Sequence, residues 1–141
     1  MNDNVPILLF DGGSRGNPGP SGCGFVIMNW DETEIIATGS EFLGKNTNNY
    51  AEYMGVILGM KKALELGINN LIIKGDSQLV IKQLLKEYSV KSPNLIPLYS
   101  IASKLILQFN NVKLYHIKRK LNVIADKLAN EAMDRENDWL E

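Results

Sequence analysis

Four acidic residues that together span most of the chain each lie in a motif that makes sense only if the acids converge. Asp11 follows the apolar run at 5–10 and Asp76 follows a second run at 71–75, while Glu52 and Asp126 fall near the starts of predicted helices. Convergence restricts the chain to folds that bring its first and last quarters to one place. The sequence therefore predicts a single carboxylate site that is assembled by folding.

The hydrophobic pattern predicts that strands come first and that strands then alternate with helices. Apolar runs predict five strands, at residues 5–10, 23–29, 34–43, 71–74 and 112–117. Helical spacing and capping residues predict helices at residues 50–66, 77–88, 94–109 and from Asn122 to about 135. The Gly/Pro-rich segment 12–22 is expected to be the turn of a first hairpin. This order is typical of an α/β protein with a mixed sheet that is covered on both faces.

Length and composition suit one domain with one core. The chain has 141 residues and 45% hydrophobic content, and only residues 134–141 look like a loose acidic end. The first apolar stretch is too short for a signal-peptide core or a membrane span, so we expect a cytoplasmic protein without membrane association. The lone cysteine, Cys23, excludes an internal disulfide and a thiolate zinc cluster, and it is expected to be a small packed residue.

The net charge of −1 hides an uneven distribution of charge along the chain. Residues 74–127 contain 10 bases and 3 acids, whereas residues 1–60 contain 2 bases and 7 acids. A local basic face can bind phosphates even when the total charge is near zero. A solvated lysine surface of the usual kind explains the same composition, so the charge alone leaves both interpretations open.

The four acids have the chemistry of a metal site. Carboxylates brought close together cannot all stay ionised without cations, because like charges raise one another's pKa. Hard oxygen ligands select Mg²⁺ or Mn²⁺, and two such ions roughly 3.5 to 4 Å apart stabilise the attacking and leaving oxygens of a phosphoryl displacement. Taken singly, any one acid is better explained by a helix cap or a surface salt bridge. The ordered set of four favours catalysis.

The motifs around these acids resemble those of the type 1 ribonuclease H family, over nearly the whole chain. They are Asp11-Gly12-Gly13-Ser14-Arg15-Gly16-Asn17-Pro18-Gly19, residues 46–52, residues 71–76 and residues 122–130. The resemblance implies a ribonuclease H-like fold, with antiparallel strands 1–3 and parallel strands 4 and 5. It also implies an enzyme that cuts the RNA strand of RNA/DNA hybrids endonucleolytically, leaving a 5′-phosphate and a 3′-hydroxyl.

By the same resemblance each site residue has an expected role. Asp11 is expected to bridge two divalent ions, Glu52 and Asp76 to complete one ion's site, and Asp126 to hold the ion that activates water. The residues expected to read the RNA 2′-hydroxyl are Gly12, Ser14, Asn48, Asn49, Glu52 and Gln78. Those expected to grip a DNA-strand phosphate are Asn17, Thr47 and Lys45, the last standing where arginine is common in the family.

The chain departs from many bacterial relatives in two places. It has no basic, tryptophan-bearing protrusion after the second helix, because the only basic residues at 84–100 are Lys86 and Lys91 and this segment has no tryptophan. Binding to the hybrid is therefore expected to be modest, or to rely on Lys118-Arg119-Lys120. The loop before Asp126 also has no histidine. His116, the only histidine, is expected to have a structural or surface role, with contact to substrate or product as the alternative.

Rival functions differ in substrate and in catalysis. The same fold could serve as a non-catalytic module that binds hybrids, or as a nuclease that also cuts double-stranded RNA. A nucleotide cradle at 12–19 is disfavoured, because the loop lacks Gly-Lys-Ser/Thr and leads to a strand rather than a helix. The preferred prediction is a monomeric enzyme with RNA/DNA hybrid as its partner and without an obligate protein partner.

Overall fold

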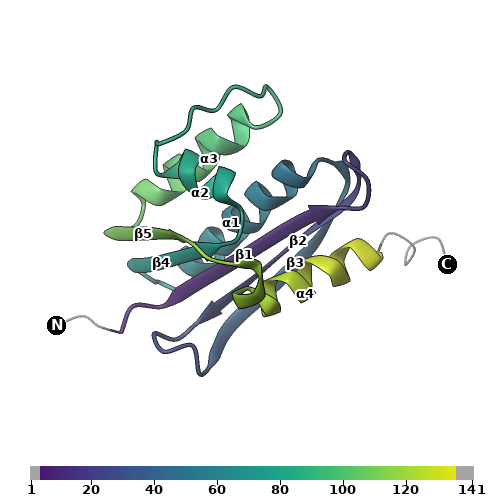
Figure 1. Ribbon diagram of the computed structural model, residues 1–141. Helices are drawn as coiled ribbons and strands as arrows, with labels where there is room; N and C mark the ends of the chain where they lie inside the picture. The colour runs from purple at the N-terminus through teal and green to yellow at the C-terminus, as the bar shows by residue number, and fades with distance from the viewer. Residues whose placement is uncertain (1–3, 136–141) are drawn as a thin grey trace.

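The computed structural model describes residues 4–135, which form a sheet with helices on both sides (Figure 1). The strands are β1 (Ile7–Ser14), β2 (Gly19–Met28), β3 (Ile35–Asn46), β4 (Asn70–Gly75) and β5 (Asn111–His116). The helices are α1 (Asn48–Glu65), α2 (Gln78–Leu84), α3 (Ile96–Leu107) and α4 (Val123–Asp134), with a short 3-10 helix at Arg119–Leu121. None of these helices is both long enough and apolar enough to cross a membrane. The predicted order of strands and helices is confirmed.

The sheet has the order β3-β2-β1-β4-β5. β1 pairs antiparallel with β2, and β2 pairs antiparallel with β3, whereas β4 runs parallel to both β1 and β5. The expected mixed sheet is therefore confirmed. The β1–β4 ladder stops at the pair Phe10 and Gly75, so Asp11 and Asp76 are the next residues on two neighbouring parallel strands.

Helices α1, α2 and α3 lie on one face of the sheet and α4 lies on the other (Figure 1). Side chains alternate along β1, so Leu8 and Phe10 pack with the first three helices, while Ile7 and Leu9 pack in the cluster that contains Ala125 of α4. Asp11 continues the Ile7 and Leu9 side. Its side chain therefore starts from the face that α4 covers.

The predicted turn at 12–22 is too long. β1 continues to Ser14 and β2 begins at Gly19, because residues 12–14 pair with residues 21–23 across the hairpin. Two glycines of the paired strands, Gly12 and Gly24, serve close packing rather than turning. A Cβ on Gly12 would lie 2.2 Å from the carbonyl carbon of Ala51 in α1, and one on Gly24 would lie 2.5 Å from Cβ of Leu128 in α4.

Other boundaries also differ from the prediction. α2 ends at Leu84 rather than near residue 88, and Lys86 beyond it has a positive φ of 65° that is incompatible with a continuing helix. Asp134 and Arg135 are not a loose end: Asp134 is the last residue of α4, and the Arg135 guanidinium donates to Oγ of Ser40 at 2.7 Å. The rest of the predicted loose end, residues 136–141, lies outside the described residues. Cys23 is fully buried, as expected.

Candidate active site

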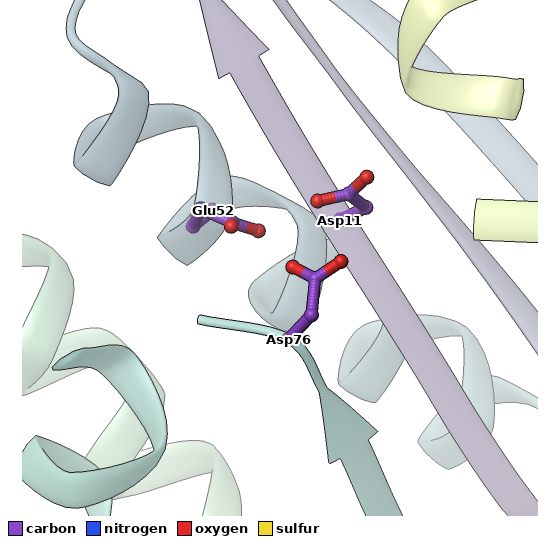
Figure 2. Close-up of side chains that lie close together, drawn as sticks. All are labelled: Asp11, Glu52 and Asp76. Atoms are coloured by element: carbon purple, nitrogen blue, oxygen red, sulfur yellow. The ribbon is translucent and has the colours of Figure 1, made fainter. Parts of the chain in front are cut away.

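Three of the four predicted acids form a compact group at the point where β1 and β4 separate. Asp11, Glu52 and Asp76 each offer a carboxylate oxygen, and these oxygens all lie within 4.8 Å of one another. Figure 2 shows the three side chains pointing toward a common centre, Asp11 from β1, Glu52 from α1 and Asp76 from the end of β4. The end of the β1–β4 ladder thus brings together acids that are separated by 65 positions in the chain.

Glu52 reaches the group because α1 packs unusually close to β1. Gly12 and Gly55 have no side chain at the contact, where a Cβ on Gly55 would lie 2.7 Å from the carbonyl oxygen of Asp11. The buried residues one, two and three turns below Glu52 on its helix face are Val56, Gly59 and Ala63, as predicted. Glu52 itself is only 9% exposed. A carboxylate is therefore held on a packing face of the helix.

Glu52 has an oxygen that no described residue satisfies. Its Oε1 atom is buried and has no hydrogen-bond partner. A buried polar atom without a partner costs folding free energy, and a buried carboxylate oxygen costs more than a neutral one. Such an atom, aimed into a group of oxygens, is the feature expected where a cation completes the structure.

Asp126 borders the same space from the opposite face of the sheet. It lies on α4, which packs over Gly24, the residue that pairs with Asp11 across the hairpin. Its Oδ1 lies 3.4 Å from Nη2 of Arg119, and its Oδ2 lies 3.4 Å from Nδ2 of Asn130. Asp126 lines the same cavity as Asp11, although it does not belong to the compact group of three.

The electrostatics of the site call for positive charge. Burial, with added effects from the adjoining Asp76 and Asp126 carboxyls, raises the pKa of Asp11 to about 7. Burial and the nearby Asp11 and Asp76 carboxyls raise the pKa of Glu52 well above its ordinary value. A divalent cation reverses both effects, because it stabilises the ionised carboxylates. The donor set consists of oxygens and fits a hard ion such as Mg²⁺ or Mn²⁺.

A cavity of about 380 Å³ surrounds the acids and connects them to predicted binding residues. Its walls include all four acids and, from the predicted substrate contacts, Gly12, Ser14 and Asn48. Arg119 also lines it and belongs to the basic segment 118–120 that was expected to aid binding. Arg15 and Asn130 line it too and were not predicted, although Arg15 lies in the motif at 11–19 and Asn130 lies one helical turn after Asp126.

Ser14, Asn17 and Asn48 are joined by hydrogen bonds between the β1–β2 turn and the start of α1. The backbone N–H of Ser14 donates to Oδ1 of Asn48 at 2.8 Å, and the N–H of Asn48 donates to Oδ1 of Asn17 at 3.0 Å. Both amide side chains thus use their oxygens within the protein. Among the described residues no acceptor is paired with Nδ2 of Asn17 or Asn48, so these donors remain available to a ligand.

The other predicted contacts lie outside the cavity wall. Thr47 is the N-cap of α1, accepting from the N–H of Tyr50 at 3.2 Å, and Lys45 is exposed at the end of β3, where it pairs with Pro20. Asn49 and Gln78 are exposed near the starts of α1 and α2. His116 is exposed at the end of β5, paired with Gly75, and does not line the cavity. A ligand that touched all of these residues would have to be much larger than the cavity.

Comparison with known proteins finds a matching family and similar relatives over most of the chain. The family described as Reverse transcriptase-like matches residues 9–132. The bifunctional protein of Mycobacterium tuberculosis is 43% identical over 128 residues, which cover 91% of this chain and 35% of that protein. The chain therefore spans about a third of the length of this curated relative.

Three solved structures are similar to this chain over nearly their whole length. The N-terminal RNase H domain of the Mycobacterium tuberculosis protein superposes with a TM-score of 0.90 at 41% identity, covering 92% of this chain and 99% of that one. RNase H1 of Halobacterium salinarum gives a TM-score of 0.88 at 39% identity, covering 92% and 98%. LC11-RNase H1, solved in complex with RNA/DNA hybrid, gives 0.85 at 32% identity, covering 92% and 97%.

Proposed function

The chain belongs to the type 1 ribonuclease H family, and we propose that it is a metal-dependent endoribonuclease that hydrolyses the RNA strand of RNA/DNA hybrids. The products are a 5′-phosphate and a 3′-hydroxyl. The observation that carries the proposal is the convergence of Asp11, Glu52 and Asp76 around an unpartnered oxygen of Glu52. An intact set of acids favours an enzyme over a module that only binds hybrids.

The four acids would hold two Mg²⁺ or Mn²⁺ ions. Asp11 groups with Glu52 and Asp76 and shares a cavity with Asp126, which suits a carboxylate that would serve both ions. Glu52 and Asp76 would complete one site, and Asp126 would complete the other. When bound, such ions lower the pKa of an attacking water and neutralise charge on the attacking and leaving oxygens.

Groups beside the acids would recognise RNA. Ser14 and Asn48 line the cavity, and the backbone N–H of Ser14 holds the Asn48 side chain by its oxygen, so that its Nδ2 can donate to a 2′-hydroxyl. Gly12, Asn49 and Gln78 belong to the same set. Short polar groups suit this task, because the 2′-hydroxyl distinguishes an RNA backbone from a DNA backbone.

Contacts farther from the cavity would bind phosphates. Asn17, Lys45 and Thr47 lie at the end of the sheet where the β1–β2 turn meets the start of α1, and we assign them the DNA-strand phosphate. The exposed segment 118–120 supplies three cations on the α4 side of the site. These contacts position a duplex without reading its sequence. The domain acts on hybrids as a cytoplasmic monomer under this proposal.

The test is cleavage of an end-labelled RNA/DNA hybrid in Mg²⁺, in Mn²⁺ and in EDTA, beside an RNA/RNA duplex and a DNA duplex of the same sequence. The proposal expects metal-dependent cutting of the RNA strand of the hybrid alone. Binding without cutting would support the non-catalytic module, and equal cutting of duplex RNA would replace hybrid specificity with a broader ribonuclease activity.

A further inference from the structure

Asn122 makes a buried contact between α4 and β1 that the proposed chemistry does not use. Its side chain is 1% exposed, and its Nδ2 donates to the carbonyl oxygen of Phe10 at 2.8 Å, across 112 positions of sequence. Phe10 is fully buried and immediately precedes Asp11. The acceptor is therefore a rigid point of the sheet that adjoins a candidate metal ligand.

The contact lies where the two acid-bearing strands separate. Phe10 and Gly75 are the last paired residues of β1 and β4, and the next residues are Asp11 and Asp76. The amide of Asn122 thus fastens the start of α4 to the sheet beside these acids.

Asn122 occupies the N-cap position of α4, but its side chain does not cap the helix. Its backbone carbonyl accepts from the N–H of Asp126 at 3.1 Å, whereas its side chain bonds to Phe10 instead. Asparagine at this position usually accepts a hydrogen bond from the helix N–H groups. The prediction that the Asn122 side chain caps the helix was therefore wrong: its amide donates to a backbone carbonyl of β1 instead.

Asp126 lies one turn after Asn122, so the placement of one determines the placement of the other. Residues four apart in an α-helix lie on the same face, about 6 Å apart along the axis. The Asp126 carboxylate itself makes two side-chain contacts. The Arg119 side chain is 79% exposed, and the contact with Nδ2 of Asn130 is 3.4 Å long, so both restrain the carboxylate weakly. The bond from Asn122 to Phe10 is shorter and buried.

The Asn122 side chain also leaves a buried oxygen without a partner. No described residue bonds its Oδ1. An apolar residue of similar size would avoid this cost, so the amide at this position is explained by the hydrogen bond that it donates to Phe10 rather than by packing alone.

From these observations we infer that Asn122 is a positioning residue that sets the separation between Asp126 and Asp11 and thereby tunes the affinity of the ion these two acids would share. This inference rests on the proposed two-ion function. It predicts that loss of the bond weakens one ion's site and leaves the Asp11, Glu52 and Asp76 group unchanged.

Two variants test the inference. Asn122→Asp keeps the size of the side chain but replaces the donor with a second acceptor facing Phe10. Asn122→Ser keeps a good N-cap residue but is too short for the same bond, so it answers the question if Asn122→Asp does not fold. Val26→Ala is the control, because Val26 is buried in the cluster that contains Ala125 and lines the same hollow as Asn122, so its truncation removes packing there but keeps the Asn122 amide.

Two readouts are needed. The first is hybrid cleavage over a range of Mg²⁺ concentrations, where we expect a kcat about 10- to 100-fold lower and a half-saturating Mg²⁺ concentration raised by a similar factor. The KM for hybrid should stay near that of the wild type. The second is Mn²⁺ binding by titration calorimetry without substrate, where the same variants should bind more weakly than Val26→Ala at matched thermal stability.

The outcomes separate this inference from the proposed activity. If both Asn122 variants match Val26→Ala in Mn²⁺ affinity and Mg²⁺ dependence, Asn122 is only structural and the inference is wrong. If the wild type cuts no hybrid but Mn²⁺ binding still depends on Asn122, the proposed activity fails and the positioning role stands.

Discussion

At the scale of single residues, the acids could be predicted from their motifs, but their surroundings could not. Asp11, Glu52 and Asp76 each stand beside a recognisable strand or helix boundary, and their oxygens meet as the pattern indicated. The ion pair between Arg119 and Asp126, and the unpartnered Oε1 of Glu52, depend on how side chains pack after folding. No spacing in the sequence encodes such contacts.

The raised pKa of Asp11 predicts how stability depends on pH without metal. Because its pKa is about 7 in the folded protein and lower in the unfolded chain, the stability it contributes is full below about pH 4 and is lost as pH rises through about 7. Glu52 acts in the same direction. In EDTA, the melting temperature should therefore be higher at pH 5 than at pH 8.

Added Mg²⁺ should oppose this loss. It should raise the melting temperature more at pH 8 than at pH 5, since protonated carboxyls bind metal poorly. Thermal melts of the wild type and Asp11→Asn at both pH values check this. If the melting temperature in EDTA rose between pH 5 and pH 8, the raised pKa values of Asp11 and Glu52 would be contradicted.

His116 gives a second prediction at this scale. It is exposed, lies at the end of β5 and does not line the cavity. His116→Ala should therefore retain most of the hybrid-cleaving activity. A fall in kcat of more than about a hundredfold, measured under multiple turnover, would instead assign it to substrate or product contact.

At the scale of elements, the sequence pattern predicted the two strands beside the site but ended the first too early and began the second too late. Glycine and proline between residues 12 and 22 indicated a long turn, yet most of these residues pair in β1 and β2. The glycines among the paired residues have no side chains, which lets α1 and α4 approach the two faces of the hairpin, a tertiary reason that a local pattern cannot show. The bounds predicted for the three long helices lie within two residues of the observed ones.

Gly24 tests this explanation. A Cβ there would lie 2.5 Å from Cβ of Leu128 and 2.7 Å from the backbone nitrogen of Ala129, so Gly24→Ala must push α4 away from the sheet. We expect a loss of about 1–3 kcal/mol in the free energy of unfolding, together with a lower kcat because Asp126 moves with the helix. Urea unfolding and steady-state cleavage measure the two effects.

Gly67→Ala is the matched control for this experiment. Gly67 has a φ of 78° and open space around its Cβ position, so alanine there costs about 1–2 kcal/mol through backbone strain alone. It should leave kcat unchanged. Equal effects of the two substitutions on kcat would mean that lost stability, rather than displacement of α4, lowers the activity.

At the scale of the whole molecule, two halves of the chain contribute different parts of the site. The hairpin and α1 supply Asp11, Glu52 and the Ser14–Asn48 contact, while β4 and α4 supply Asp76 and Asp126. The directions of the strands followed from the family resemblance, whereas the order of the strands in the sheet was not predicted, since hydrophobic runs do not specify which strands are neighbours. Whether residues 1–141 act as a single catalytic domain stays a prediction.

The most direct test of the account is the cleavage rate of an RNA/DNA hybrid by Asp11→Asn in saturating Mg²⁺, with Glu65→Gln as an exposed acid-to-amide control. Asp11→Asn keeps the size of the side chain but removes the charge that both ions would share. The account predicts a folded variant whose kcat falls by more than about a hundredfold, beyond the usual loss when a residue that only supports a metal site is changed. Cleavage by Asp11→Asn at nearly the wild-type rate would contradict it.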